Sequence, residues 1–219
     1  MSNFIEDSPS LKKEKVTKLT KELRDVMVGK LLGDAHLETQ NNGKTWRLKI
    51  ERSIKQKNYV IYLYNLFFQF VATPPKVVKN RSKDNIFFQT LSYGCFRFYG
   101  QQFYVNKIKV VPKIIKRLLT PRVLGYWYAD DGLIKSKQSK AVLLNTQGYT
   151  LKEVIFLCKV LQDKFLLDSC PRRQKEGWQI YISGKSYQTF KELIFPFLIP
   201  DMFYKLPEEN KKITQLPKK

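Results

Sequence analysis

The pattern of hydrophobic and polar positions runs through one order of elements twice. In segment 44–52, Trp46, Leu48 and Ile50 alternate with charged or polar residues, which predicts a strand with one charged face. A mostly apolar helix is expected over 56–71, because the run ends before two consecutive prolines. The same pattern then predicts a hairpin over 76–91 and a helix from about Gly100. The second half is predicted to repeat this order with a strand over 140–147, a helix over 150–166, a hairpin over 170–183 and a helix from about Lys185.

Two short helical runs open the halves, at 24–37 and at 121–134. Each carries two small residues four positions apart, and these are Gly29 and Gly33 in the first run, and Gly125 and Ala129 in the second. Glycine inside a helix costs about 1 kcal/mol relative to alanine, so a close approach of another backbone is needed to justify it. We therefore predict that the two helices pack on each other through these small residues. The expected fold is α+β, with two αββαββα halves related by a pseudo-two-fold axis and an antiparallel sheet in each.

Both helical runs carry an acid near their end, Asp34 or Asp131, and a lysine follows each acid at nearly the same distance. Lys109 comes 75 residues after Asp34, and Lys205 comes 74 residues after Asp131. Two carboxylates at packed helix ends repel each other unless a cation lies between them. Mg²⁺ prefers oxygen ligands of this kind, and the negative ends of the helix dipoles also favour it. Metal ions there could activate water for phosphodiester hydrolysis, with the lysines supplying positive charge at the same site.

Composition points to a polyanionic partner. The 219 residues include 40 Lys+Arg and 19 Asp+Glu, which gives a formal charge of +21. DNA, RNA and an anionic membrane surface all fit that charge. Three cysteines without a C-x-x-C pair and a single histidine argue against a disulfide framework or a zinc site. The longest apolar stretch, 59–72, is too short to span a bilayer, and the start is not a secretory signal, so no membrane association is expected.

The charged faces of the predicted strands form a candidate DNA surface. A curved sheet of this kind can lie along the major groove, where Arg and Lys contact guanine edges and phosphates. The candidates in the first half are Arg47, Lys49, Lys79, Arg81 and Lys83, and those in the second half are Arg172, Arg173, Lys175 and Gln179.

The two helical runs that contain Asp34 and Asp131 resemble the motifs of a known family. The chain resembles the LAGLIDADG homing endonucleases, in the single-chain form with two motifs and of the yeast mitochondrial intron type. "LGYWYADDG" matches the motif well, with Asp131 at the acid and Gly132 last, whereas "MVGKLLGDA" has Ala35 in place of the final glycine. The segments "LLNTQGYT" and "FLIPDMFYKLP" extend the resemblance over about residues 22–207.

This resemblance implies a site-specific enzyme that makes a staggered double-strand break with 3′ overhangs in a long asymmetric DNA site and so promotes intron mobility. Asp34 and Asp131 would share two or three Mg²⁺ ions, and Lys109 and Lys205 would be active-site lysines. Glu51 and Gln147 would occupy secondary active-site positions. The resemblance further implies a monomer encoded by an intron in a mitochondrion or chloroplast. The expected parts are an N-terminal extension (1–21), half-domains over 22–118 and 119–207, and a basic tail (208–219).

Two other functions fit the fold. An RNA maturase, which binds its host intron RNA and aids splicing, explains the charge equally well and does not need the acids. A non-catalytic DNA-binding regulator would be expected to lack one acid or both lysines, and all four are present. Spacing alone does not choose between Asp130 and Asp131 as the second acid; matching to the motif favours Asp131 and leaves the role of Asp130 open.

Overall fold

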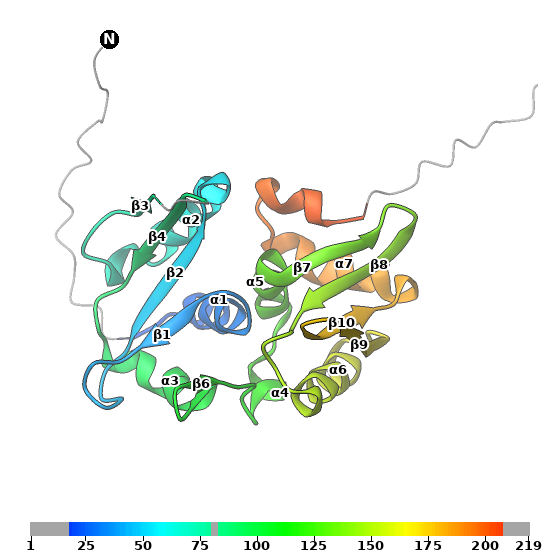
Figure 1. The fold of residues 1–219 in the computed structure, drawn as a ribbon, viewed down its shortest axis with the longest axis horizontal. Coiled ribbons are helices and arrows are strands. Elements are labelled where there is room, and N and C mark those ends of the chain that lie inside the picture. The colour runs from blue at the N-terminus through cyan, green and yellow to red at the C-terminus, as the bar shows by residue number, and fades with distance from the viewer. Residues whose placement is uncertain (1–17, 80–82, 208–219) are drawn as a thin grey trace, which may run out of the picture.

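Two similar halves stand side by side, each with one antiparallel sheet of four strands (Figure 1). The computed structural model describes residues 18–79 and 83–207. The first sheet has the order β1-β2-β4-β3 and the second the order β7-β8-β10-β9. The predicted α+β fold with antiparallel sheets is confirmed. The first sheet consists of β1 (His36–Glu38), β2 (Arg47–Ser53), β3 (Lys76–Val78) and β4 (Asn85–Gln89). The second consists of β7 (Gly132–Ser136), β8 (Ser139–Asn145), β9 (Ser169–Gln174) and β10 (Gly177–Ile182).

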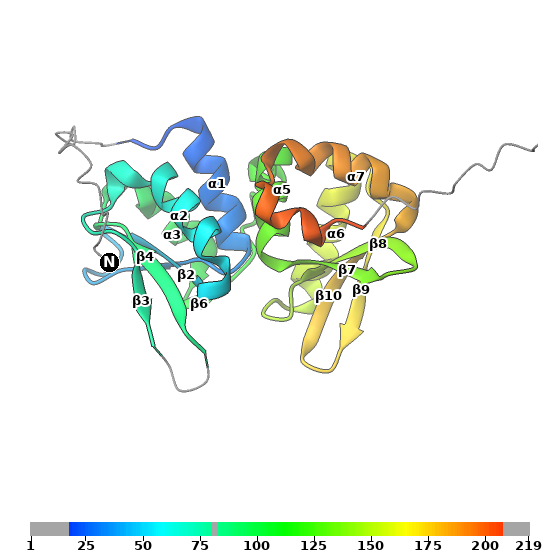
Figure 2. The same ribbon diagram turned by 90° about the horizontal axis from the view of Figure 1, so that it is seen from above.

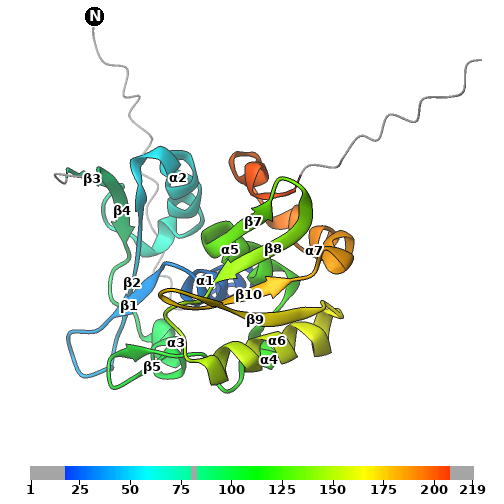
Figure 3. The same cartoon turned by 45° about the vertical axis from the view of Figure 1, so that its right-hand side comes forward.

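Helices cover one side of the sheets, and the hairpins project to the other side (Figure 2). Helix α6 lies along β9 in two different views (Figures 1 and 3). The helices are α1 (Lys21–Leu32), α2 (Lys57–Leu66), α3 (Arg97–Phe103), α4 (Ile115–Leu118), α5 (Pro121–Asp131), α6 (Leu151–Phe165) and α7 (Tyr187–Ile194). A small hairpin of β5 (Tyr104–Val105) and β6 (Ile108–Lys109), followed by α4, leads from the first half to the second. No helix within the described ranges combines the length and the apolar character that crossing a bilayer would need.

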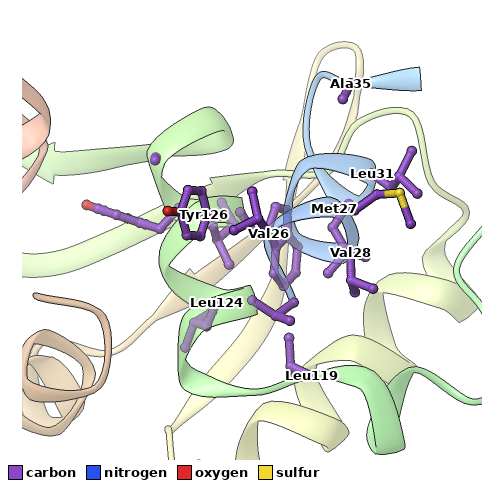
Figure 4. Packing of buried hydrophobic residues seen from close by; sticks show 14 of the residues in the cluster. Val26, Met27, Val28, Leu31, Ala35, Leu119, Leu124 and Tyr126 are labelled. Atoms are coloured by element: carbon purple, nitrogen blue, oxygen red, sulfur yellow. The ribbon is translucent and has the colours of Figure 1, made fainter. Parts of the chain in front are cut away.

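Helices α1 and α5 pack against each other at the centre of the molecule (Figures 1 and 4). A Cβ atom on Gly29 would lie 2.6 Å from the carbonyl oxygen of Val123 and 2.7 Å from the Cβ of Tyr126. A Cβ atom on Gly33 would lie 2.6 Å from the Cβ of Asp130. All three distances are far below van der Waals contact, so α5 can approach α1 this closely only because glycine stands at positions 29 and 33.

The prediction that Gly125 packs against the first central helix was wrong. A Cβ atom on Gly125 would meet the Cβ of Phe197 at 3.0 Å and the carbonyl oxygen of Ile194 at 3.4 Å. Gly125 therefore faces the C-terminal end of α7 rather than α1, and Ala129, four residues further on, follows it on that side of α5 by helical spacing. The α5 residues opposite the two α1 glycines are Tyr126 and Asp130, one position after each predicted small residue.

A threonine caps the N-terminus of each central helix. A turn follows the end of α1, and strand β7 follows the end of α5. The Thr20 side chain accepts a hydrogen bond from the Leu23 N–H at 3.2 Å, and that of Thr120 accepts one from the Val123 N–H at 3.2 Å. Thr120 also donates to Asp25 on α1 at 2.9 Å, which ties the two helix starts together.

Several predicted helices are shorter in the structure. The first central helix stops at Leu32, and the second stops at Asp131 because Gly132 is extended and begins β7. The helix expected over 56–71 ends at Leu66, and a 3₁₀ turn follows over Phe68–Phe70.

Candidate active site

The two predicted acids line one cavity at the adjacent ends of α1 and α5. Asp34 follows α1 by two residues and its side chain is 45% exposed, whereas Asp131 is the last residue of α5 and is half-buried. The cavity has a volume of about 450 Å³. Its lining consists of Leu32, Gly33, Asp34, Lys109, Asp131, Asn145, Thr146, Gln147, Gly148, Tyr149 and Glu176. Residues almost a hundred positions apart in the sequence thus form a single polar site.

The two predicted lysines hold the backbone beside the acids. Lys109 donates from Nζ to the carbonyl oxygens of Gly33 and Ala35, at 2.6 and 2.9 Å, on either side of Asp34. Lys205 donates to the carbonyl oxygen of Asp130 at 2.8 Å. Carbonyl groups at a helix end lack partners within the helix, and each lysine satisfies one or more of them. The lysines occupy matching places in the two halves.

Burial shifts the titration of these groups. It lowers the pKa of Lys109 and that of Lys205 to about 8, although the nearby aspartates act in the opposite direction. The pKa of Asp131 rises to about 8, first because the carboxyl is buried and then because Asp130 and Asp34 are negatively charged. The protonated form of Asp131 is therefore favoured at neutral pH.

Asp130 is the buried centre of an ionic network. Its side chain is fully buried, and one of its oxygens accepts ion-paired hydrogen bonds from Lys30 and Arg52. The other oxygen accepts the backbone N–H of Asp34 at 3.2 Å. Burial alone would raise the pKa of Asp130, but the charges of Lys30 and Arg52 hold it below the usual value. Arg52 also pairs with the carboxylate of Asp34.

Sequence reasoning missed Lys30 and Arg52. Lys30 is completely buried on α1, and its ammonium lies 4.8 Å from the centre of the Tyr59 ring. A lysine within the otherwise apolar run MVGKLLG is the signal that could have indicated a buried ion pair, because an unpaired lysine is too costly to bury. Arg52 gave no such signal, since it lies within a strand that already alternates charged residues.

The two secondary positions differ from each other. Gln147 lies two residues beyond β8 and lines the cavity. Glu51 lies within β2, where Lys49 and Asn85 each bind its carboxylate at 2.9 Å. The register of the paired strands gives Glu51 a different counterpart in the second half from the predicted one. Leu37 pairs with Leu48, and Gly132 pairs with Leu144. When each register is extended to the acid, Glu51 stands across from Asp34 and Asn145 across from Asp131, so Glu51 corresponds to Asn145 rather than to Gln147.

The candidate DNA-contact residues lie on or beside the two projecting hairpins and on β2. Lys79, Lys83, Arg172, Arg173 and Lys175 are exposed. Arg173 stacks over the Trp178 ring, with 5.2 Å between guanidinium and ring centre. On β2, Arg47 pairs with Glu38 at 2.6 Å and Lys49 pairs with Glu51. Arg81 lies outside the described residues.

Gln179 departs from the prediction of a DNA contact. It is only 7% exposed, and its amide donates to the Oδ1 of Asn145 at 2.6 Å. A buried amide already bound in this way is not available to a base edge, so Gln179 supports a residue of the cavity wall instead.

The donor set at the cavity fits a hard cation that has additional ligands from elsewhere. Asp34 and Asp131 offer carboxylate oxygens, which Mg²⁺ and Mn²⁺ accept. Within the described ranges, no group of three or more His, Cys, Asp or Glu side chains is placed to hold a metal ion. A cation at this site would therefore complete its shell with water and with phosphate oxygens of a bound nucleic acid.

Comparison with known proteins shows which family the chain matches. The model of the LAGLIDADG DNA endonuclease family matches residues 24–190. The chain belongs to this family. The predicted family is thereby confirmed.

Curated LAGLIDADG relatives cover most of the chain. A probable intron-encoded endonuclease 1 of Wickerhamomyces canadensis is 31% identical over 204 residues, which are 89% of this chain and 87% of that protein. DNA endonuclease I-ChuI of Chlamydomonas applanata is 29% identical over 213 residues, 88% of this chain and 98% of that protein. Cytochrome b mRNA maturase bI2 of Saccharomyces cerevisiae is 28% identical over 205 residues, 86% of this chain and 48% of that protein.

Solved structures agree with the fold. The homing endonuclease I-WcaI, solved bound to its DNA recognition sequence, superposes with a TM-score of 0.83 and 30% identity over 94% of this chain and 96% of that one. I-DmoI, solved in complex with DNA and Mn, superposes with a TM-score of 0.52 and 13% identity over 81% of this chain and 98% of that one, which supports the fold alone.

Proposed function

We propose that this LAGLIDADG protein is a site-specific homing endonuclease that makes a staggered double-strand break, with 3′ overhangs, in a long asymmetric DNA site. The observation that carries the proposal is the shared cavity of Asp34 and Asp131 at the meeting ends of α1 and α5, with a lysine beside each acid. One chain supplies both acids, so a monomer of two half-domains, 22–118 and 119–207, is sufficient for two cuts.

Asp34 and Asp131 would hold two or three Mg²⁺ ions, which lower the pKa of bound water and offset the charge that develops on the phosphate. A bound cation would favour the ionised form of Asp131. Lys109 and Lys205 fix the backbone of the two acids through their carbonyl contacts. With pKa values of about 8, both lysines can hold or release a proton at Nζ close to neutral pH. Gln147 lines the cavity and would orient water there.

The β3–β4 and β9–β10 hairpins project from the same side of the molecule (Figure 2). They carry exposed basic side chains, which would lie along the duplex. Lys79, Lys83, Arg172 and Arg173 would hold phosphates or contact base edges. Relatives with names such as intron-encoded endonuclease support an origin in a mobile intron, and we infer an organellar genome as its host.

The deciding experiment uses DNA that carries the intronless insertion site, with Mg²⁺ or with EDTA. We expect two staggered cuts with Mg²⁺ and none with EDTA, measured on end-labelled strands in a sequencing gel. Absence of cleavage with Mg²⁺ and with Mn²⁺ at every insertion site tested would contradict the proposal.

A second candidate function is that of an RNA maturase. Two curated relatives, from Saccharomyces cerevisiae and Debaryomyces hansenii, are named cytochrome b mRNA maturase bI2, and they are 28% and 30% identical to this chain. A groove of about 550 Å³ lies at the N-terminal end of α1, away from the acids. Its lining includes the basic residues Lys18, Lys21, Arg24 and Arg117 and the exposed ring of Phe98. Basic side chains beside an exposed ring suit single-stranded RNA. Tight binding to the intron RNA without DNA cleavage would favour this function.

A further inference from the structure

The two acids of the site have different surroundings. The carboxylate of Asp34 is bound by Arg52. Among the residues described, the carboxylate of Asp131 has no hydrogen-bond or ion-pair partner. The two motifs are related by pseudo-symmetry, so an arginine on one acid alone calls for a specific explanation.

The pseudo-symmetric counterparts of the network residues carry no charge. Four positions before each acid stand Lys30 in the first half and Trp127 in the second, and one position before stand Gly33 and Asp130. By the same strand register, the residue of the second half that corresponds to Arg52 is Thr146. Thr146 is buried, and its hydroxyl donates to the Trp178 carbonyl oxygen at 2.7 Å. The ionic network is therefore built on one side only. It spans the interface, since Lys30 and Arg52 belong to the first half and Asp130 to α5.

Arg52 is held rigidly enough to position a second group. Its side chain is only 9% exposed, and one terminal nitrogen binds Asp130 while the other binds the Oδ2 of Asp34. Asp130 is fixed in turn by Lys30 and by the backbone N–H of Asp34. Planar guanidinium groups that bind two carboxylates define the direction of both. The Oδ1 of Asp34 has no partner among the described residues and is the atom left for a cation.

We propose that Arg52, anchored by the buried Asp130–Lys30 pair, is a positioning residue that orients Asp34 alone, so that this network serves the cutting of one DNA strand and not the other. This inference rests on the proposed endonuclease function. It also gives Asp130 a role, as the anchor of Arg52 rather than as a metal ligand.

The test in cleavage compares the two strands. Asp34→Asn identifies the strand that depends on Asp34, as the strand whose cutting it slows more. Arg52→Gln should slow that same strand at least about tenfold more than the other, because a misplaced reacting group costs rate steeply. Asp130→Asn should act in the same direction but less strongly, and Arg52→Lys should restore part of the loss. Arg97→Lys, an exposed arginine on α3, is the matched control and should leave the strand ratio unchanged. Equal slowing of both strands by Arg52→Gln, or no slowing, would overturn the proposal.

A second measurement works without metal and without DNA. Urea unfolding in EDTA is followed for Arg52→Gln, Asp34→Asn and the double variant, and the same cycle is repeated with Arg52→Lys if Arg52→Gln does not fold. We expect non-additive midpoints, because removing either partner already breaks the Arg52–Asp34 pair. Additive midpoints would overturn the pairing. If the wild-type protein cut no DNA, the endonuclease function would fail, and this cycle would still decide whether Arg52 holds Asp34.

Discussion

The two halves of this protein share an order of strands and differ in what surrounds the acid. In the first half, Lys30 and Arg52 bring two positive charges into the interface, and Gly33 makes room for Asp130. In the second half, the buried Trp127 and Thr146 occupy the corresponding places. A duplicated fold therefore keeps its symmetry in the backbone, while a single chain allows each side chain at the interface to differ.

Removing either acid should have the largest effect. Asp34→Asn and Asp131→Asn should each lower the rate of double-strand cleavage by about a thousandfold or more, because each removes a carboxylate that we propose as a ligand of the cation. DNA binding in Ca²⁺, measured by fluorescence anisotropy, should be retained. Double-strand cutting by either variant at the wild-type rate would contradict the assignment of these acids.

Removing the buried lysine should destabilise the first half. Lys30→Met removes one of the two cations that pair with the buried Asp130 among the described residues, and we expect a loss of about 3 kcal/mol in the free energy of unfolding. Urea denaturation measures it. Lys152→Met, an exposed position on α6, is the control and should change stability by less than about 0.5 kcal/mol.

Alanine substitutions at Gly33 and Gly125 should distinguish the tight contact between α1 and α5 from the looser contact between α5 and Phe197. Gly33→Ala places Cβ 2.6 Å from the Cβ of Asp130, whereas Gly125→Ala places it 3.0 Å from the Cβ of Phe197. We expect a loss of about 2 kcal/mol for Gly33→Ala, in the range typical of overpacking, and a smaller loss for Gly125→Ala. Thermal unfolding of both variants checks the order, and a larger loss for Gly125→Ala would contradict it.

The pKa of Asp131 predicts a pH dependence of stability. Its folded pKa of about 8 lies above the ordinary value, so the folded state binds more protons than the unfolded state between about pH 4 and 8. Without metal, stability should therefore fall as pH rises through this window, by at most about 1.4 kcal/mol per pH unit from this group. Asp131→Asn should remove that part of the slope in urea titrations from pH 5 to pH 8. An unchanged slope would show that Asp131 is ionised in the folded protein.

Single substitutions of the candidate DNA-contact residues should have the smallest effects, and these effects should be on DNA binding. Arg47 is bound to Glu38, whereas Arg172 is exposed and has no ion-pair partner among the described residues. Arg172→Ala should therefore weaken DNA binding by about 1 kcal/mol and lower the salt dependence, and Arg47→Ala should have a smaller effect. Binding titrations at several salt concentrations measure both. An equal loss for the two variants would show that Glu38 releases Arg47 when DNA binds.

The sequence alone determined a large part of this protein. Hydrophobic periodicity located the central helices and most strands, and the repeated order of elements indicated two similar halves. The spacing of acid and lysine identified Asp34, Asp131, Lys109 and Lys205, and the structure brings the acids into one cavity with both lysines beside the helix ends. These features could be predicted because repetition and periodicity are properties of the chain order itself.

Only the tertiary structure decided how the two helices face each other and how the charges between them are paired. The α5 surface against α1 is that of Tyr126 and Asp130, one residue away from the predicted small residues, because a shift of one residue rotates a helix face by about 100°. The roles of Lys30 and Arg52 depend on Asp130, which lies 100 positions from Lys30 and 78 from Arg52. Burial gives these charges their effect on pKa and stability, and burial exists only once the two halves have packed together.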